Sequence, residues 1–201
     1  MGKGAKVGIT ILIALIVLVF WLVSYFVKTN NKIVGLDQGV KNGWGEVQNQ
    51  YQRRYDLIPN LVETVKGYAA HERGTLEAVT EARAKVGGVT NLRAEDLTPE
   101  NMAKFQQAQA GLSGALQRLM VVVEQYPNLK ANENFIRLQD DLSGTENRIA
   151  VARNRFNDAV KEYNTTINQI PANFVAALRN FTAKAYFEGE TQAQQAPKVK
   201  F

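Results

Sequence analysis

Hydrophobic residues along this chain follow two patterns: one continuous apolar run near the N-terminus and, after it, positions spaced three and four apart. The run covers residues 7–27 (VGITILIALIVLVFWLVSYFV) and contains no charged residue. At ~1.5 Å per residue, a helix of this length spans about 30 Å, the thickness of a bilayer's hydrocarbon core. Phe20, Trp21, Tyr25 and Phe26 gather at its C-terminal end, where aromatic side chains favour the membrane interface. We therefore predict a transmembrane anchor.

A cleaved signal peptide is the alternative interpretation of the run. Its apolar core would be about 7–15 residues long and would be followed by a small-x-small cleavage site, and the chain shows neither feature. The basic tail before the run carries Lys3 and Lys6, whereas Lys28, Lys32 and Lys41 follow it. Short basic tails tend to stay in the cytoplasm, and long domains translocate largely regardless of charge. We expect the N-terminus inside and the large domain outside.

The spacing of three and four residues in the remainder predicts long helices that pack side by side. Within residues 33–86 the seam holds either Arg54 or Tyr55 at one position, and Pro59 lies inside it. Because proline removes one backbone donor and crowds the preceding turn, we expect a kink or a break near Leu57. The apolar positions of this segment are Val40, Trp44, Val47, Tyr51, Ile58, Leu61, Val65, Tyr68, Leu76, Val79, Ala82 and Val86.

Three further helices are expected over about residues 98–126, 131–170 and 173–187. Thr98 is suited to cap the first of them, with Pro99 at its first position, and Pro127 should end it. Ile170, Phe174 and Leu178 fall on apolar faces of the other two. Either the segment 33–86 bends at Pro59 or its first part stands apart as a stalk. A bare stalk would expose Val40, Trp44 and Val47, so we expect them to pack on the helix over 131–170, on the helix over 173–187 or on another copy of the chain.

No stretch alternates with period two, so the sequence predicts an all-α fold. We expect a single N-terminal transmembrane helix followed by an antiparallel bundle of three long helices plus a shorter fourth. The expected domains are a basic N-tail (1–6), the anchor (7–27), the helical bundle (28–187) and a mobile C-terminal tail (188–201).

Composition removes several classes of function. The chain has no Cys and one His, which excludes disulfides, thiol catalysis and Cys-rich metal sites. His71-Glu72 lacks the second His of a zinc helix, and no phosphate-binding glycine loop occurs. The formal net charge is +5, but three of the cations flank the anchor, so nucleic-acid binding is not favoured. We expect no cofactor, no metal and no small-molecule substrate, although dispersed Glu and Arg residues leave an enzyme as a third hypothesis.

The segments NQYQRRYDLIPNLVETVKGYAAHERGTLEAVTEARAKV (49–86) and ALQRLMVVVEQYPNLKANENFIRLQDDLSGTENRIAVARNRFNDAVKEYN (115–164) resemble the LemA family, as does the ending AYFEGETQAQQAPKVKF. The resemblance implies a bacterial protein anchored in the cell (inner) membrane, with a small antiparallel helical bundle and no cofactor. A relative serves in magnetosome membrane formation. The segment VKNGWGEV (40–47) departs from the family pattern because glycines flank its tryptophan.

The family segments contain polar residues that are candidates for shaping the bundle or for docking a partner. These residues are Arg53, Arg54, Asp56, Pro59, Asn60, Asn132, Asn134 and Arg148. Arg53, Arg54 and Asp56 surround the expected bend and are candidates to pair with the third long helix. The alternative is that all of them only fix the shape of the bundle.

Two hypotheses about function follow. The first is a membrane-anchored, non-catalytic scaffold or interaction module, which self-associates or docks a protein partner through helix-mediated contacts. The second is a lipid-binding or membrane-shaping protein, because lysines flank the apolar run.

Overall fold

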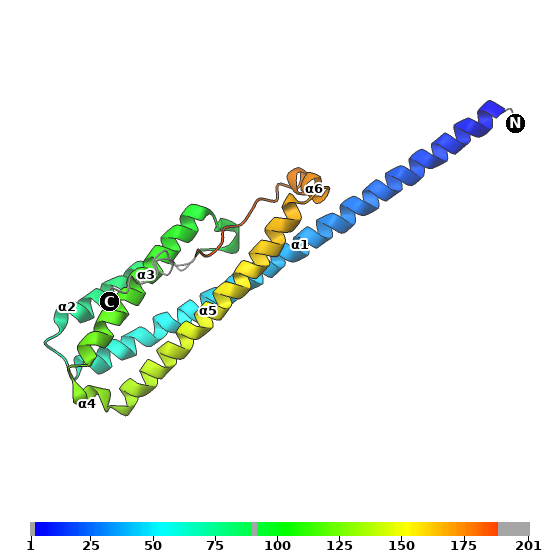
Figure 1. Cartoon of the computed structure of the whole chain (residues 1–201). Coiled ribbons are helices and arrows are strands. Elements are labelled where there is room, and N and C mark those ends of the chain that lie inside the picture. Colours follow the sequence, from blue (N-terminus) through cyan, green and yellow to red (C-terminus); the bar gives the residue numbers. More distant parts are fainter. Residues whose placement is uncertain (1–2, 90–91, 189–201) are drawn as a thin grey trace, which may run out of the picture. The chain divides into compact units, whose positions relative to one another are not determined.

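The computed structural model describes residues 3–89 and 92–188, and every regular element in these ranges is helical. The prediction of an all-α protein is therefore confirmed. In chain order the elements are α1 (Lys3–Lys66), α2 (Arg73–Gly87), the short 3-10 helix η1 (Ala94–Asp96), α3 (Pro99–Val123), α4 (Pro127–Lys130), α5 (Glu133–Asn168) and α6 (Ala172–Leu178) (Figure 1).

The chain divides into two compact units, and each is described here by itself. The first unit comprises Met1–Gly39 and Lys161–Ala183, and the second comprises Val40–Val160 and Lys184–Phe201. Helices α1 and α5 each contribute residues to both units.

The first unit contains the apolar run, which forms an unbroken part of α1. Within the described residues, α1 is the one helix that is long and apolar enough to cross a membrane. The large apolar side chains of residues 7–23 are exposed, among them Phe20 and Trp21. A stretch of this length with no buried partner is suited to lipid rather than to a protein core. The chain is accordingly membrane-associated.

The rest of the first unit is a small core built from the middle of α1, the end of α5 and α6. Ile33, Tyr163 and Val175 are buried. The Tyr163 hydroxyl donates a hydrogen bond to the Thr182 carbonyl oxygen at 3.1 Å, which ties α5 to the segment after α6. These contacts fold the end of α5 and all of α6 into one compact body with residues of α1.

Tyr163 is the residue of this core whose protonation responds most to folding. Burial, reinforced by the negative charge of Asp37, raises the pKa of Tyr163 from 10.0 to about 12. The neutral phenol is therefore favoured in the folded state relative to the unfolded chain. Because the folded state holds this proton more tightly, Tyr163 contributes stability below about pH 10 that is lost as the pH rises towards 12.

This gives a prediction for alkaline solution. The difference between the phenolate absorbance titrations of the wild-type chain and the Tyr163→Phe variant should show one tyrosine that ionises near pH 12. The wild-type chain should also lose stability between about pH 10 and pH 12 more steeply than the variant, because only the wild type must release this buried proton. A difference titration centred on 10.0 would contradict the expectation.

The second unit packs α2, α3 and parts of α1 and α5 around two clusters of buried side chains. The apolar cluster contains Ile58, Leu61, Val65, Ala69, Leu76, Val79, Val86, Leu112, Ala115, Leu119, Val123, Leu129, Phe135 and Leu142. The aromatic cluster, as we name it, consists of Trp44, Tyr51, Phe105, Phe156 and Phe187. Most of the positions that the helical spacing assigned to seams are thus buried. Trp44 packs on Phe156 of α5, as expected, and also on Phe105 of α3, which was not expected.

The start of α3 forms as the sequence predicts. The Thr98 hydroxyl accepts a hydrogen bond from the Asn101 backbone N–H at 3.2 Å, and Pro99 occupies the first helical position. Pro127, which was expected to end that helix, instead begins the single turn of α4, while α3 already ends at Val123.

Of the kink or break expected near Leu57, the break is wrong. Helix α1 continues through Pro59 and ends at Lys66, so residues 33–86 form two helices divided after Lys66 rather than before Pro59. Gly67 follows this end directly, and Tyr68, expected in the seam, is exposed. Glycine is a poor helix former, and the proline is compensated from elsewhere, as described below.

The predicted helix over 173–187 is also wrong in its second half. Helix α6 ends at Leu178, and Asn180 has a φ of 55°, a left-handed conformation that ends helices. Over residues 181–188, the last that the structure describes, the chain has no regular structure. Ile170, Phe174 and Leu178, which were expected to be buried, are exposed. The tail expected from residue 188 lies, after Glu188, outside the described residues.

Candidate functional site

Arg54 is the buried charge of the second unit and the centre of its polar interior. Only 2% of the residue is exposed, and its guanidinium donates hydrogen bonds to Gln109, to the Ser113 hydroxyl at 3.1 Å and to the Glu146 carboxylate at 2.9 Å. The sequence left Arg54 and Tyr55 as alternatives for one seam position, and Arg54 is the one that is buried. Its partners come from α3 and α5, so one side chain joins three helices.

A cavity of 220 Å³ lies beside this cluster, lined by Arg54, Gln109 and Glu146 together with Tyr51 and Arg153. Two buried donors, Arg54 Nε and Gln109 Nε2, have no hydrogen-bond partner among the described residues. Burial raises the pKa of Tyr51, although the nearby arginines oppose the shift, so the phenol stays neutral. Two of the residues that line the cavity thus carry unpartnered buried donors, and the neutral Tyr51 phenol is not an activated nucleophile.

Tyr55 lies on the next position of α1 and resolves the problem that Pro59 creates. Since proline has no N–H, the Tyr55 carbonyl lacks the helical donor that it would otherwise receive from residue 59. Arg83 of α2 takes that place: its Nε donates to the Tyr55 carbonyl oxygen at 3.2 Å. The same guanidinium lies 3.7 Å from the centroid of the Tyr55 ring, which adds a cation–π contact. An arginine from a second helix thus allows α1 to continue through a proline.

This arrangement predicts that Pro59 and Arg83 are energetically coupled. Arg83→Met should lower the free energy of unfolding of the full chain in detergent by about 1–2 kcal/mol, because the partly buried Tyr55 carbonyl loses its donor. In a Pro59→Ala background the new backbone N–H can serve that carbonyl, so the same substitution should cost about 1 kcal/mol less. Urea unfolding of the four variants, followed by circular dichroism, measures the coupling. Equal losses in both backgrounds would show that Arg83 acts only through the Tyr55 ring.

The other candidates near Pro59 lie on the surface of the bundle. Arg53 is 3.8 Å from the Asp141 carboxylate of α5, so both arginines contact this helix. The Asp56 carboxylate accepts a hydrogen bond from the Gln52 amide at 2.7 Å, within α1. Asn60 is exposed, and its backbone carbonyl accepts from the Thr64 hydroxyl at 2.8 Å. Only Arg54 of this group belongs to the interior.

The three candidates near the start of α5 and along it are not part of the Arg54 cluster. The Asn132 side-chain oxygen Oδ1 accepts from the Phe135 N–H at 3.1 Å, and its side-chain Nδ2 donates to the Tyr68 hydroxyl at 2.9 Å. Arg148 donates to the Thr145 hydroxyl at 2.9 Å, and Asn134 is exposed. Asn132 therefore caps α5, which is a structural task.

Sequence reasoning missed Ser113, Glu146 and Arg83 as partners of the motif. Contacts between residues of different helices leave no trace in spacing along one chain, which explains the omission. The signals that could have indicated a polar interior are Arg54 and Gln109 themselves, since both occupy seam positions among apolar residues. No group of three or more His, Cys, Asp or Glu side chains that could hold a metal occurs in the described parts of the chain.

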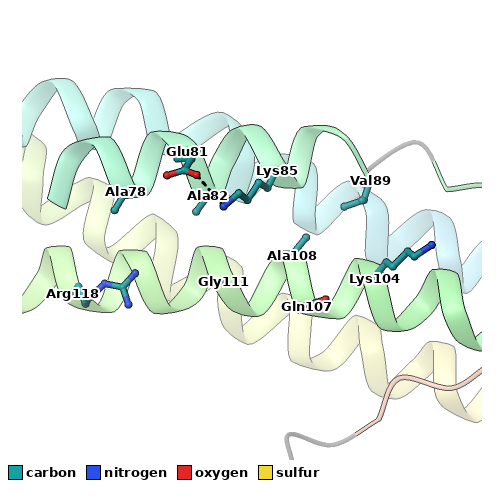
Figure 2. Close-up of a pocket in the computed structure, with 10 residues that line it drawn as sticks. All are labelled: Ala78, Glu81, Ala82, Lys85, Val89, Lys104, Gln107, Ala108, Gly111 and Arg118. Atoms are coloured by element: carbon teal, nitrogen blue, oxygen red, sulfur yellow. Dashed lines mark ion pairs between the residues drawn. The ribbon is translucent and has the colours of Figure 1, made fainter. Parts of the chain in front are cut away.

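A groove between α2 and α3 is the second feature that sequence reasoning missed. It has a volume of 560 Å³, and small residues from both helices line it, namely Ala78, Ala82, Ala108 and Gly111 (Figure 2). Small side chains leave the two helix backbones accessible, so another chain segment can approach closely. The complete lining adds Glu81, Lys85, Val89, Lys104, Gln107 and Arg118.

The charges around this groove are predominantly positive. The lining residues include three cations, Lys85, Lys104 and Arg118, and one carboxylate, that of Glu81, which pairs with Lys85 at 3.0 Å. Lys104 pairs with Glu100 of its own helix at 2.7 Å. The side chains of both ion pairs are well exposed. Exposed pairs of this kind contribute little stability and exchange partners readily. The groove therefore presents an apolar floor with cations that an acidic segment can engage.

Comparison with known proteins finds relatives that match most of the chain. It is 26% identical to the magnetosome protein MamQ 2 of Paramagnetospirillum magneticum, over 99% of this chain and 78% of the relative. The magnetosome protein MamQ of Magnetospirillum gryphiswaldense is also 26% identical, with the same shares covered. Protein LemA of Metamycoplasma hominis is 22% identical over 81% of this chain and 70% of the relative. The model of the LemA family matches residues 43–201, which includes the Arg54 cluster and the groove, and the chain belongs to the LemA family.

Proposed function

We propose that this protein is a membrane-anchored, non-catalytic interaction module of the bacterial cell envelope, and that the groove between α2 and α3 receives an acidic amphipathic helix of a protein partner. The groove carries the proposal: its floor of small residues allows close packing, and its three cations select a partner of opposite charge. The apolar anchor restricts that encounter to the membrane surface. The Arg54 cluster supports the proposal indirectly, since it holds α1, α3 and α5 in register behind the groove.

The test is to fill the groove without disturbing the fold. Gly111 and Gly114 both lie in α3, and a Cβ added at either position would meet open space. Only Gly111 lines the groove. A photo-crosslinking residue in place of Gln107 in intact cells should capture a specific protein, which a crosslinker in place of the exposed Asp158 on α5 should not capture. The acidic helix of that protein, as a peptide, should then bind the purified full chain in nanodiscs.

Gly111→Leu should weaken peptide binding at least about tenfold, because the leucine occupies the place of a partner side chain. Gly114→Leu should leave binding unchanged and serves as the matched control. The proposal fails if position 107 captures nothing beyond what position 158 captures, or if both leucine variants bind alike. Capture of a second copy of this chain instead would identify self-association and would overturn the acidic-partner proposal.

We further propose that the bundle lies outside the cytoplasm, because the short N-tail before the anchor is basic. The chain has no Cys, so Asn154→Cys, at an exposed position on α5, introduces a single thiol as a reporter. A maleimide that cannot cross the inner membrane should label this thiol in cells whose outer barrier has been opened. Protection until the cells are lysed would reverse the orientation.

A further inference from the structure

Helix α6 and Ile170, two residues before it, carry the most exposed large apolar side chains outside the anchor. Ile170 is 80% exposed, Phe174 70% and Leu178 73%, more than any other large apolar side chain described beyond residue 27. Phe174 and Leu178 are one helical turn apart and share a face. On the opposite side of α6, Val175 and Ala176 are buried and hold the helix to its unit. An apolar face this exposed is typical of a surface that another phase or molecule covers.

The place of α6 in the fold indicates what covers it. Arg179, which directly follows α6, donates a hydrogen bond from Nε to the Asn30 side-chain oxygen at 3.1 Å. Asn30 is only about 5 Å along α1 from Val27, where the apolar run ends. Figure 1 shows α6 beside α1. When residues 7–27 span the hydrocarbon core, Asn30 and α6 therefore lie at the depth of the lipid headgroups.

The charges at this level match a lipid surface rather than a protein groove. Lys28, Lys32 and Arg179 are exposed around the same end of the anchor, where they can contact anionic headgroups. An aromatic ring and two aliphatic side chains next to basic residues are the composition of segments that lie in the interface plane. The covalent anchor also keeps α6 at the bilayer permanently, which favours a weak contact that would not persist on its own.

We propose that α6 is a second membrane contact, in which Ile170, Phe174 and Leu178 insert into the boundary between headgroups and acyl chains of the leaflet where the anchor ends. This inference rests on the proposed membrane anchoring, but it is independent of the groove between α2 and α3. Insertion would give the first unit two points of attachment, so the unit would be held against the bilayer instead of swinging on one helix.

Depth-dependent fluorescence quenching tests this contact on the full chain, reconstituted in vesicles of phosphatidylcholine and phosphatidylglycerol. An environment-sensitive dye is attached to Ala177→Cys, which is exposed on α6, or to Gln38→Cys, which is exposed on α1 farther from the anchor. Lipids with a nitroxide near the headgroup should quench the dye at position 177 strongly and the dye at position 38 weakly. Equal quenching at the two positions would overturn the proposal.

The apolar side chains are tested by Ile170→Ser, Phe174→Ser and Leu178→Ser together in the position-177 background. Quenching should fall to the level of position 38, while helicity is kept because the replaced side chains are exposed. The matched control carries Val121→Ser, Ile136→Ser and Val151→Ser, three exposed apolar residues of the second unit, and should be quenched like the parent. Unchanged quenching in the first triple variant, or crosslinks between copies through position 177, would overturn the proposal. Neither result depends on partner binding at the groove.

Discussion

Replacing Trp44 with alanine should lower the free energy of unfolding by about 3–5 kcal/mol. The indole is 1% exposed, and its ring centroid lies 5.2 Å from that of Phe105 and 5.6 Å from that of Phe156. Its N–H also donates to the Leu92 carbonyl oxygen at 2.8 Å, so the substitution opens a cavity and removes the donor of a partly buried carbonyl. Urea unfolding of the full chain in detergent micelles, followed by far-ultraviolet circular dichroism, measures the loss.

The chain offers a matched control for this substitution. Trp21 is the other tryptophan, it lies in the apolar run, and it is 61% exposed. Trp21→Ala removes the same atoms from a position without a packed core, so the bundle should unfold at nearly the wild-type urea concentration. Similar losses in both variants, or a loss below about 1 kcal/mol for Trp44→Ala, would show that the aromatic cluster is not a main source of the stability of the second unit.

The helical spacing predicted that Trp44 is buried, but it could not predict all of its neighbours. Phe187 contributes a ring to the same cluster from a segment that was expected to be helical. Asn157 of α5 holds this segment instead, accepting from the Phe187 N–H at 2.9 Å and donating to its carbonyl oxygen at 3.0 Å. Periodicity identifies which face of a helix is apolar, whereas the partner of that face depends on contacts between distant segments.

The two glycines around Trp44 illustrate the same limit. The resemblance to the family drew attention to both of them, and only the structure separates their roles. A Cβ on Gly43 would approach the Phe156 Cα to 3.3 Å, whereas a Cβ on Gly45 would meet open space. Gly43 therefore permits close approach of α1 and α5, while Gly45 carries only the usual cost of glycine in a helix.

Apolar residues near α6 show a second kind of limit, because spacing does not reveal what surrounds a side chain. Ile170, Phe174 and Leu178 fit a helical seam in sequence, yet they are exposed in the fold. A seam that faces protein and a face that meets lipid have the same pattern of residues. Their position next to the anchor became visible only through the contact between Arg179 and Asn30.

Substitutions of Arg54 should separate the role of its volume from the role of its charge. Arg54→Ala should lower the free energy of unfolding by about 2–4 kcal/mol, because it leaves a cavity and strands Gln109 and Ser113. Arg54→Met keeps most of the volume and removes the charge. The Glu146 side chain is 58% exposed and remains solvated without its partner, whereas Gln109 and Ser113 still lose their donor. The methionine variant should therefore lose about 1–2 kcal/mol, less than the alanine variant, because it leaves no large cavity.

This pair of variants decides what the buried arginine is for. If Arg54→Met were as unstable as Arg54→Ala, the hydrogen bonds to α3 and α5 would be the main source of stability, and the role of Arg54 would be structural. If Arg54→Met is stable, the bundle does not need the charge to fold. Loss of crosslinking at position 107 in that stable variant would then mean that the guanidinium sets the geometry of α3 for partner binding. Retained crosslinking would remove Arg54 from the interaction and leave the groove to act through its own residues.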